Sequence, residues 1–164
     1  MITDADLLFC EAQDCGQSAS TFVSTNVYDR GPLATGNAGV ASMGSGRPLY
    51  FYWLCEETFA SSGGATIKVE LVSDALVGGH DANSIRHYNS GLMDASTGGT
   101  PIAAGNFAFA PLPSKSIDGQ GEWQRYLAVL FTVATATTTA GTITAGIVED
   151  PSIIINHASA LNFA

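Results

Sequence analysis

Positive charge is scarce in this sequence. Only six of the 164 residues are Lys or Arg, against fifteen Asp and Glu, which gives a formal net charge of −9. The six are scattered along the chain at Arg30, Arg47, Lys68, Arg86, Lys115 and Arg125. A protein that neutralises phosphates needs clustered Lys and Arg, so we expect no nucleic-acid partner. The same argument excludes binding to an anionic membrane surface.

Charge of either sign is also low. Charged residues make up 13% of the chain, whereas average soluble domains carry about 25%. Ala, Gly, Ser and Thr are abundant instead. A sparsely charged surface favours a protein that is partly covered in an assembly.

Cysteine is rare and odd in number, with only Cys10, Cys15 and Cys55. A disulfide framework uses an even set in a secreted protein, and the C-x4-C spacing lacks the second pair of a zinc site. We therefore expect three buried thiols. The first 20 residues contain no Lys or Arg, unlike a signal peptide, and no run approaches the roughly 20 apolar residues of a membrane helix. We expect a chain that is made in the cytoplasm.

Helical periodicity is nearly absent, and short apolar runs alternate with clusters of Gly, Pro, Ser and Asn. The predicted strands are 21–29, 48–57, 65–74, 84–90, 100–104, 106–113, 124–135, 142–150 and 152–156. About eight strands at such spacings predict one all-β domain, a jelly-roll-like antiparallel β-sandwich.

Three further features of the architecture are expected. The tight SSGG connection makes strands 48–57 and 65–74 look like a β-hairpin. Residues 1–15 are predicted to form an N-terminal arm, and residues 157–164 a C-terminal tail. Three adjacent bulky residues cannot all face inward from one short segment, so the arm is expected to make contacts through Leu7, Leu8 and Phe9.

One predicted strand, PLYFYWLCEE at 48–57, is apolar on both faces. Its faces alternate between Leu49, Phe51, Trp53, Cys55 on one side and Tyr50, Tyr52, Leu54 on the other. We expect the first set to face the space between two sheets, opposite Ile67, Val69 and Leu71. The second set then needs a cover, and we expect it from a neighbouring subunit, from the N-terminal arm or from the loop 31–46.

Tyrosine suits an interface because it buries a ring while its hydroxyl still reaches water or a partner. Together with the arm, this argument gives a set of candidate interface residues. They are Leu7, Leu8, Phe9, Tyr50 and Tyr52.

Patterns typical of catalysis are missing. The glycine-rich loop 36–46 contains no lysine, so it is not a phosphate-binding P-loop. No G-x-S-x-G nucleophile elbow occurs, and no spacing pairs a Cys with a His. We expect no catalytic residues and no cofactor.

Two groups of polar residues are weighed as possible ligands. His80 and His87, near Asp81, are interpreted as surface residues rather than a metal pair, because their separation of seven fits no known ligand spacing. The acidic pairs Glu56–Glu57 and Glu149–Asp150 lie at strand ends and are expected to be solvated. They would bind calcium only if the strands bring them together. We therefore expect no metal site.

Several short motifs occur in a fixed order, namely LLF at Leu7–Phe9, G-x-P-L-Y at Gly46–Tyr50, Gly63–Gly64, RYLAVLFTV at Arg125–Val133 and GTITAGIV at Gly141–Val148. In this order they resemble the capsid cement (decoration) proteins of tailed bacteriophages. The resemblance implies a jelly-roll-like fold, a homo-oligomer (dimer or trimer) and binding to the major capsid protein on the outside of an icosahedral shell. It implies a virion protein made in the host cytoplasm, with no catalysis and no cofactor.

Two alternatives stay open. A carbohydrate-binding jelly-roll module, as in a phage fibre, would present exposed Trp or Tyr, but Trp53 and Trp123 are placed within or at the start of strands. A sandwich-type enzyme would use carboxylates without fixed spacing, such as Glu56, Glu57 or Glu149.

Overall fold

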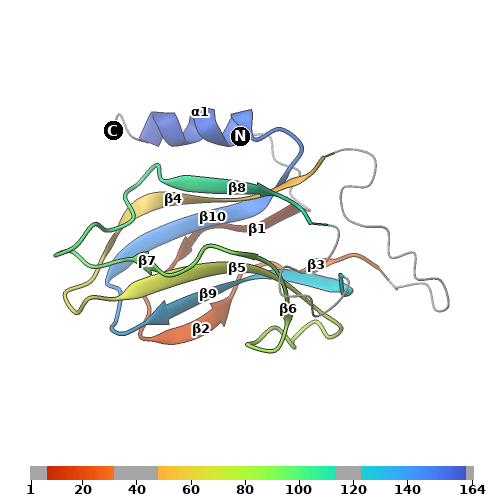
Figure 1. Cartoon of the computed structure of the whole chain (residues 1–164), viewed down its shortest axis with the longest axis horizontal. Helices are drawn as coiled ribbons and strands as arrows, with labels where there is room; N and C mark the ends of the chain where they lie inside the picture. Colours follow the sequence, from red (N-terminus) through yellow and green to blue (C-terminus); the bar gives the residue numbers. More distant parts are fainter. Residues whose placement is uncertain (1–6, 32–47, 114–122, 162–164) are drawn as a thin grey trace.

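A computed structural model describes residues 7–31, 48–113 and 123–161, and its strands form two antiparallel sheets in separate layers (Figure 1). Sheet A has the order β1 (Leu8–Asp14), β10 (Ala140–Val148), β4 (Tyr50–Ala60) and β8 (Phe107–Pro111). Sheet B has the order β2 (Ser20–Val23), β9 (Tyr126–Ala134), β5 (Thr66–Asp74) and β6 (Ile85–Asn89). Two short strands complete it, β3 (Tyr28–Asp29) beside β9 and β7 (Met93–Asp94) beside β5.

The strand pairing is nested. β1 pairs with β10, β2 with β9, β4 with β8, and β5 with β6, all antiparallel. A chain folded back on itself and then rolled up produces this order, which is that of a jelly roll. The predicted all-β antiparallel sandwich is confirmed.

The core lies between the two sheets, and the alternation in β4 places its residues as predicted. Phe51, Trp53 and Cys55 belong to one buried cluster together with Ile67, Val69 and Leu71 of β5, with Leu49 packed at its margin. The Trp53 indole Nε1 donates a hydrogen bond of 3.0 Å to the Tyr88 hydroxyl.

The predicted hairpin of β4 and β5 is wrong, because β4 lies in sheet A and β5 in sheet B. Both strands present large apolar side chains to the same core, so they face each other rather than pair side by side. Their connection crosses between the layers, and there the Ser61 hydroxyl donates to the Thr137 carbonyl at 2.7 Å. The predicted strand at 100–104 is also wrong, since these residues are irregular.

The predicted N-terminal arm is instead largely a strand of the sandwich. β1 begins at Leu8, and Phe9 is buried with its ring centroid 6.5 Å from that of Phe51. The β1–β10 register shifts between Leu8 and Cys10. Such a bulge lets the neighbours Phe9 and Cys10 both reach the core, which a regular strand forbids.

The predicted strand 152–156 is wrong, because helix α1 spans Ser152–Leu161, and the predicted tail therefore starts within it. The Asp150 carboxylate accepts a hydrogen bond of 2.9 Å from the Ser152 amide, and Pro151 suits the first turn of a helix. These start signals and the packing of the helix outweigh the preference of three isoleucines for strands. No helix among the described residues is long and apolar enough to span a membrane.

Candidate interaction surfaces

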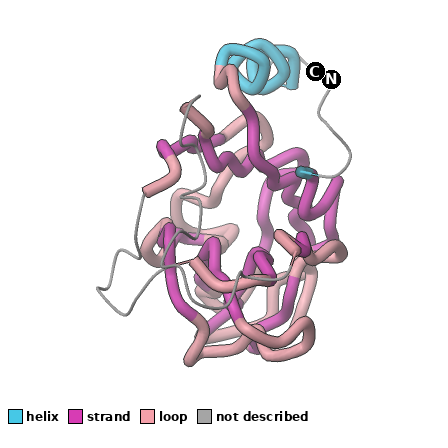
Figure 2. Tube along the Cα trace, turned by 90° about the vertical axis from the view of Figure 1, so that its right-hand side faces the viewer, coloured by secondary structure: helices cyan, strands magenta, loops and turns pink. Residues whose placement is uncertain are grey.

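Helix α1 covers part of the outer face of sheet A (Figures 1 and 2). Ile154 is buried and forms a small cluster with Tyr52 and Val148, against which Tyr50 and Phe107 pack. The expectation that a neighbouring subunit covers Tyr52 is therefore wrong, since Tyr52 is buried within the single chain and packs against its own helix. Residues 1–6 of the expected N-terminal arm lie outside the described residues. The other proposed cover, the loop 31–46, lies almost wholly outside the described residues.

Tyr52 is a core residue rather than a contact residue. A Cβ added to Gly146 would lie 3.0 Å from the Tyr52 Cε1, so the ring packs directly on that glycine. The Tyr52 hydroxyl is buried and has no hydrogen-bond partner within the described part of the chain. Burial raises the pKa of this hydroxyl above its usual value.

Phe9 is likewise part of the core, so two of the five predicted interface residues are buried by the chain itself. Leu7, Leu8 and Tyr50 are half-buried, and Leu7 packs against the central core. Of the five, Tyr50 and Tyr52 lie beside the exposed Phe109 of sheet A, and of these two only Tyr50 is itself partly exposed.

An apolar surface remains on the outer side of sheet A, where Phe109 is 40% exposed, Ile153 36% and Ile155 41%. With the half-buried Tyr50 and Phe107 these residues define the β8–α1 surface. The rings of Phe107 and Phe109 stack with centroids 6.2 Å apart, and Tyr50 meets Phe109 edge-on at 6.3 Å. Neither β8 (FAFAP) nor α1 (SIIINHASAL) contains a Lys, Arg, Asp or Glu. The surface is therefore apolar and uncharged in an acidic protein.

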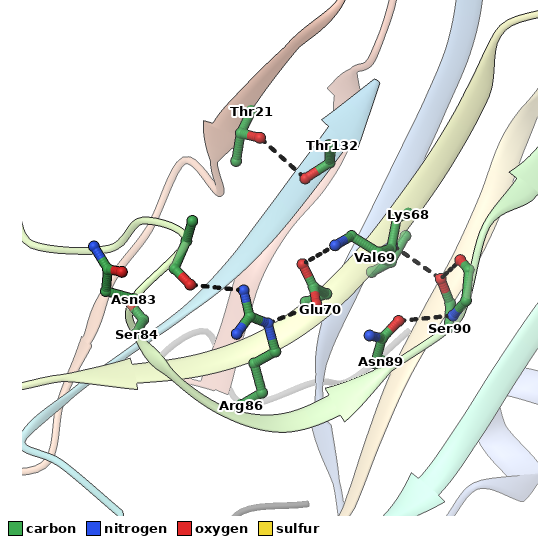
Figure 3. A network of polar contacts seen from close by, with 12 residues as sticks. Thr21, Lys68, Val69, Glu70, Asn83, Ser84, Arg86, Asn89, Ser90 and Thr132 are labelled. Carbon is green, nitrogen blue, oxygen red and sulfur yellow. Dashed lines mark hydrogen bonds and ion pairs between the residues drawn. The ribbon is translucent and has the colours of Figure 1, made fainter. Parts of the chain in front are cut away.

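The outer face of sheet B has a different character (Figure 3). Glu70 is 2% exposed and accepts charge-assisted bonds of 2.8 Å from Lys68 Nζ and from Arg86 Nε. The Arg86 guanidinium also donates to the Ala82 carbonyl at 2.8 Å. Beside this network lies a small buried apolar cluster of Val72, Ala128, Leu130 and their neighbours Val23 and Val27. This face is therefore polar and charged at its surface, with Lys68 and Arg86 partly exposed.

Three other exposed apolar residues lie in loops, namely Leu76 at 69%, Val77 at 61% and Leu92 at 70%. Leu76 and Val77 follow β5, while Leu92 precedes β7. Isolated apolar residues on a surface are ordinary, so these carry less weight than a contiguous apolar surface.

The two histidines are buried, so their interpretation as surface residues is wrong. His80 Nε2 lies 3.2 Å from the Tyr126 carbonyl. His87 Nε2 lies 2.8 Å from the Ser73 hydroxyl, and its ring stacks on Trp123 at 3.5 Å. Asp81 is exposed and accepts the Asn83 amide at 2.6 Å, as in a turn. Among the described residues, no three His, Cys, Asp or Glu side chains gather as metal ligands.

The Ser73–His87 contact is interpreted as a hydrogen bond that stabilises the fold. Both residues are buried, and the Ser73 hydroxyl already accepts a hydrogen bond of 2.9 Å from the Gln124 amide.

Trp53 and Trp123 are also buried, at 5% and 1% exposed. Neither ring offers the exposed platform that a carbohydrate-binding module needs.

The acidic pairs are not brought together. Glu57 lies opposite Thr142, whereas Val148, just before Glu149, lies opposite Tyr50. Six residues of strand separate the two places, which is about 20 Å. A calcium site that uses both pairs is therefore excluded by the register.

The three cysteines are free and buried, as predicted. Burial raises the pKa of the Cys10 and Cys55 thiols to about 12. Such thiols are poor nucleophiles, because the reactive species is the thiolate.

The comparison with protein-family models identifies one family. A protein-family model described as Bbp16 matches residues 9–147, which is most of the chain and includes every strand of the sandwich except the first residue of β1 and the last of β10. No curated protein matches the sequence.

Proposed function

The chain belongs to the Bbp16 family, whose name suggests a phage protein, and we propose that it is a cement protein of a phage capsid. In this proposal it binds the major capsid protein on the outer surface of an icosahedral shell, associates with further copies of itself, and has neither catalytic activity nor a cofactor. The observation that carries the proposal is the β8–α1 surface, an uncharged apolar area on a jelly roll whose opposite face is polar.

Binding alone explains how such a protein reinforces a shell. Any molecule that binds the assembled shell but not its separated subunits stabilises the shell by mass action. The formal net charge of −9 suits the exterior of a particle better than an interior filled with DNA.

Helix α1 is well built for such a contact. Successive residues of an α-helix lie about 100° apart, so the burial of Ile154 leaves Ile153 and Ile155 on its two flanks. Both flanking side chains are more than one-third exposed. Burying them against a capsid removes apolar surface from water without desolvating a charge.

Co-sedimentation with purified capsids tests the proposal. The wild-type protein should pellet with capsids, and Ile153→Ser/Ile155→Ser should bind at least about tenfold more weakly. Leu76→Ser/Val77→Ser removes comparable exposed apolar groups elsewhere and should bind as the wild type does. The capsid-binding function is wrong if the wild type stays in the supernatant. The assigned surface is wrong if only the control variant loses binding.

A further inference from the structure

Strand β8 is an edge strand, since its only strand neighbour among the described residues is β4. The two strands pair from Tyr50 opposite Pro111 to Leu54 opposite Phe107. Just beyond the strand, the Leu112 amide donates to the Leu49 carbonyl at 2.9 Å, and the Cys55 amide donates to the Asn106 carbonyl at 2.8 Å.

These two bonds fix which amides of β8 are occupied. In an antiparallel ladder, hydrogen-bonded and non-bonded positions alternate. Because residues 106 and 112 bond to β4, so do Ala108 and Ala110. The N–H and C=O groups of Phe107 and Phe109 therefore point to the open edge of sheet A.

Among the described residues, this edge lacks two of the devices by which proteins block edge pairing, namely charged side chains and a covering segment. β8 has no charged residue, and its register with β4 is regular from Phe107 to Pro111. A bulge lies only just before it, where the Gly105 amide and the Asn106 carbonyl both bond Cys55. Proline occurs once, at Pro111, where it has no N–H to offer. Two consecutive bonding positions, Phe107 and Phe109, have no strand partner on this side within the described part of the chain.

We propose that this edge pairs antiparallel with β8 of a second copy of the chain, with Phe107 opposite Phe109 of the partner subunit. A twofold axis at Ala108 relates the strands in this register. Phe107 and Phe109 of each copy then use both of their free N–H and C=O groups, so the pair gains four hydrogen bonds. A register centred on Phe109 would instead oppose Phe107 to Pro111 of the partner subunit, which has no N–H to donate.

Charge favours a second copy as the occupant of this edge. Two copies with a formal net charge of −9 each repel one another, so they associate most readily through uncharged surface. β8 and α1 supply such surface. The pairing joins two copies of sheet A into one sheet, with both α1 helices on the same face and the phenylalanine rings of the two copies facing across the axis.

This inference gives a surface to the self-association in the proposed function and rests on it, but it does not depend on capsid binding. Cysteine cross-linking tests the register, because the native thiols are buried. Facing Cα atoms in a bonded pair are about 5.5 Å apart, within the range of a disulfide. Phe107→Cys and Phe109→Cys should form little cross-linked dimer alone and abundant cross-linked dimer when mixed. No cross-link in the mixture, or one with Phe109→Cys alone, would overturn the assignment.

A proline tests the backbone bonds. Phe109→Pro removes an outward N–H and no bond to β4, whereas Phe109→Thr loses the same ring and keeps the N–H. Since each dimer contains position 109 twice, the dissociation constant of Phe109→Pro should exceed that of Phe109→Thr by at least about tenfold. Equal constants with equal melting temperatures would overturn the assignment. A wild-type protein that is monomeric in light scattering would overturn the proposed self-association as well. Capsid binding is tested separately, by co-sedimentation with capsids.

Discussion

Tyr52 offers the sharpest test of how sheet A is covered. Its hydroxyl is buried without a hydrogen-bond partner among the described residues, and its ring packs with Val148 and Ile154. A buried unsatisfied polar group costs about 1 to 3 kcal/mol. Tyr52→Phe removes that group and keeps the ring, so it should raise the free energy of unfolding by about 1 kcal/mol. For a chain of this size the melting temperature should rise by about 3 °C.

Tyr52→Ala should have the opposite effect. It leaves a cavity between Gly146, Val148 and Ile154, where Tyr52 is 0% exposed. Loss of a buried aromatic ring lowers the free energy of unfolding by about 3 to 5 kcal/mol. Trp53→Ala, on the other face of β4, should lower it by a similar amount.

Urea unfolding and sedimentation velocity on the three variants decide the matter. If Tyr52→Ala has the wild-type free energy of unfolding but associates with itself more weakly, then Tyr52 is an interface residue and its assignment to the core is wrong. A loss of stability in Tyr52→Phe would contradict the assignment of an unsatisfied hydroxyl. A higher free energy of unfolding for Tyr52→Phe and a lower one for Tyr52→Ala would support the assignment of Tyr52 to the core beneath α1.

Two further predictions concern the core. Because burial raises the pKa of the Cys10 and Cys55 thiols to about 12, stability is fully present below their ordinary value of 9.0 and is lost as the pH rises toward 12. The melting temperature should therefore fall steadily above about pH 9, and a flat profile to pH 11 would contradict this. Deleting residues 1–9 removes the buried Phe9 and should destabilise the fold by at least about 3 to 5 kcal/mol. A truncated protein with the melting temperature of the full chain would contradict this prediction, because it would show that Phe9 and the start of β1 are not needed for stability.

The alternation of side chains predicted the orientation of the strands well. Phe51 and Trp53 had to face opposite to Tyr52, and the same rule placed Ile67 and Val69 across the core. Alternation is a local property, so it is visible in the sequence. It gives the inward face of a strand without giving its neighbour.

Sheet membership was not visible in the same way. The short SSGG connection between β4 and β5 suits a hairpin, yet the two strands lie in different sheets. Pairing depends on residues far apart in sequence, such as Ala145 beside Trp53 and Phe131 beside Val69. The bulged β1 was missed for the same reason, since its register is set by β10 at the other end of the chain.

Helix α1 could have been predicted from the sequence. Asp150 and Pro151 form a helix start signal, and Ile154 with Ala158 has the four-residue spacing of a buried helix face. Three adjacent isoleucines suggested a strand instead. The β8–α1 surface could not be predicted without this helix, because its exposed members Ile153 and Ile155 are defined by the burial of the residue between them.

The two edges of sheet A, β1 and β8, differ in how well they can pair with another strand. At one edge, β1 is bulged and folds its polar residues outward, with Glu11 and Asp14 exposed, so it repels an acidic copy. At the other edge, β8 is uncharged and lies between the bulge at Gly105 and Asn106 and the residue Pro111, so the proposed pairing is confined to Phe107 and Phe109. Because sheet A has one blocked edge and one short open edge among the described residues, the proposed pairing adds a single partner strand to this sheet and closes as a twofold dimer instead of extending the sheet further.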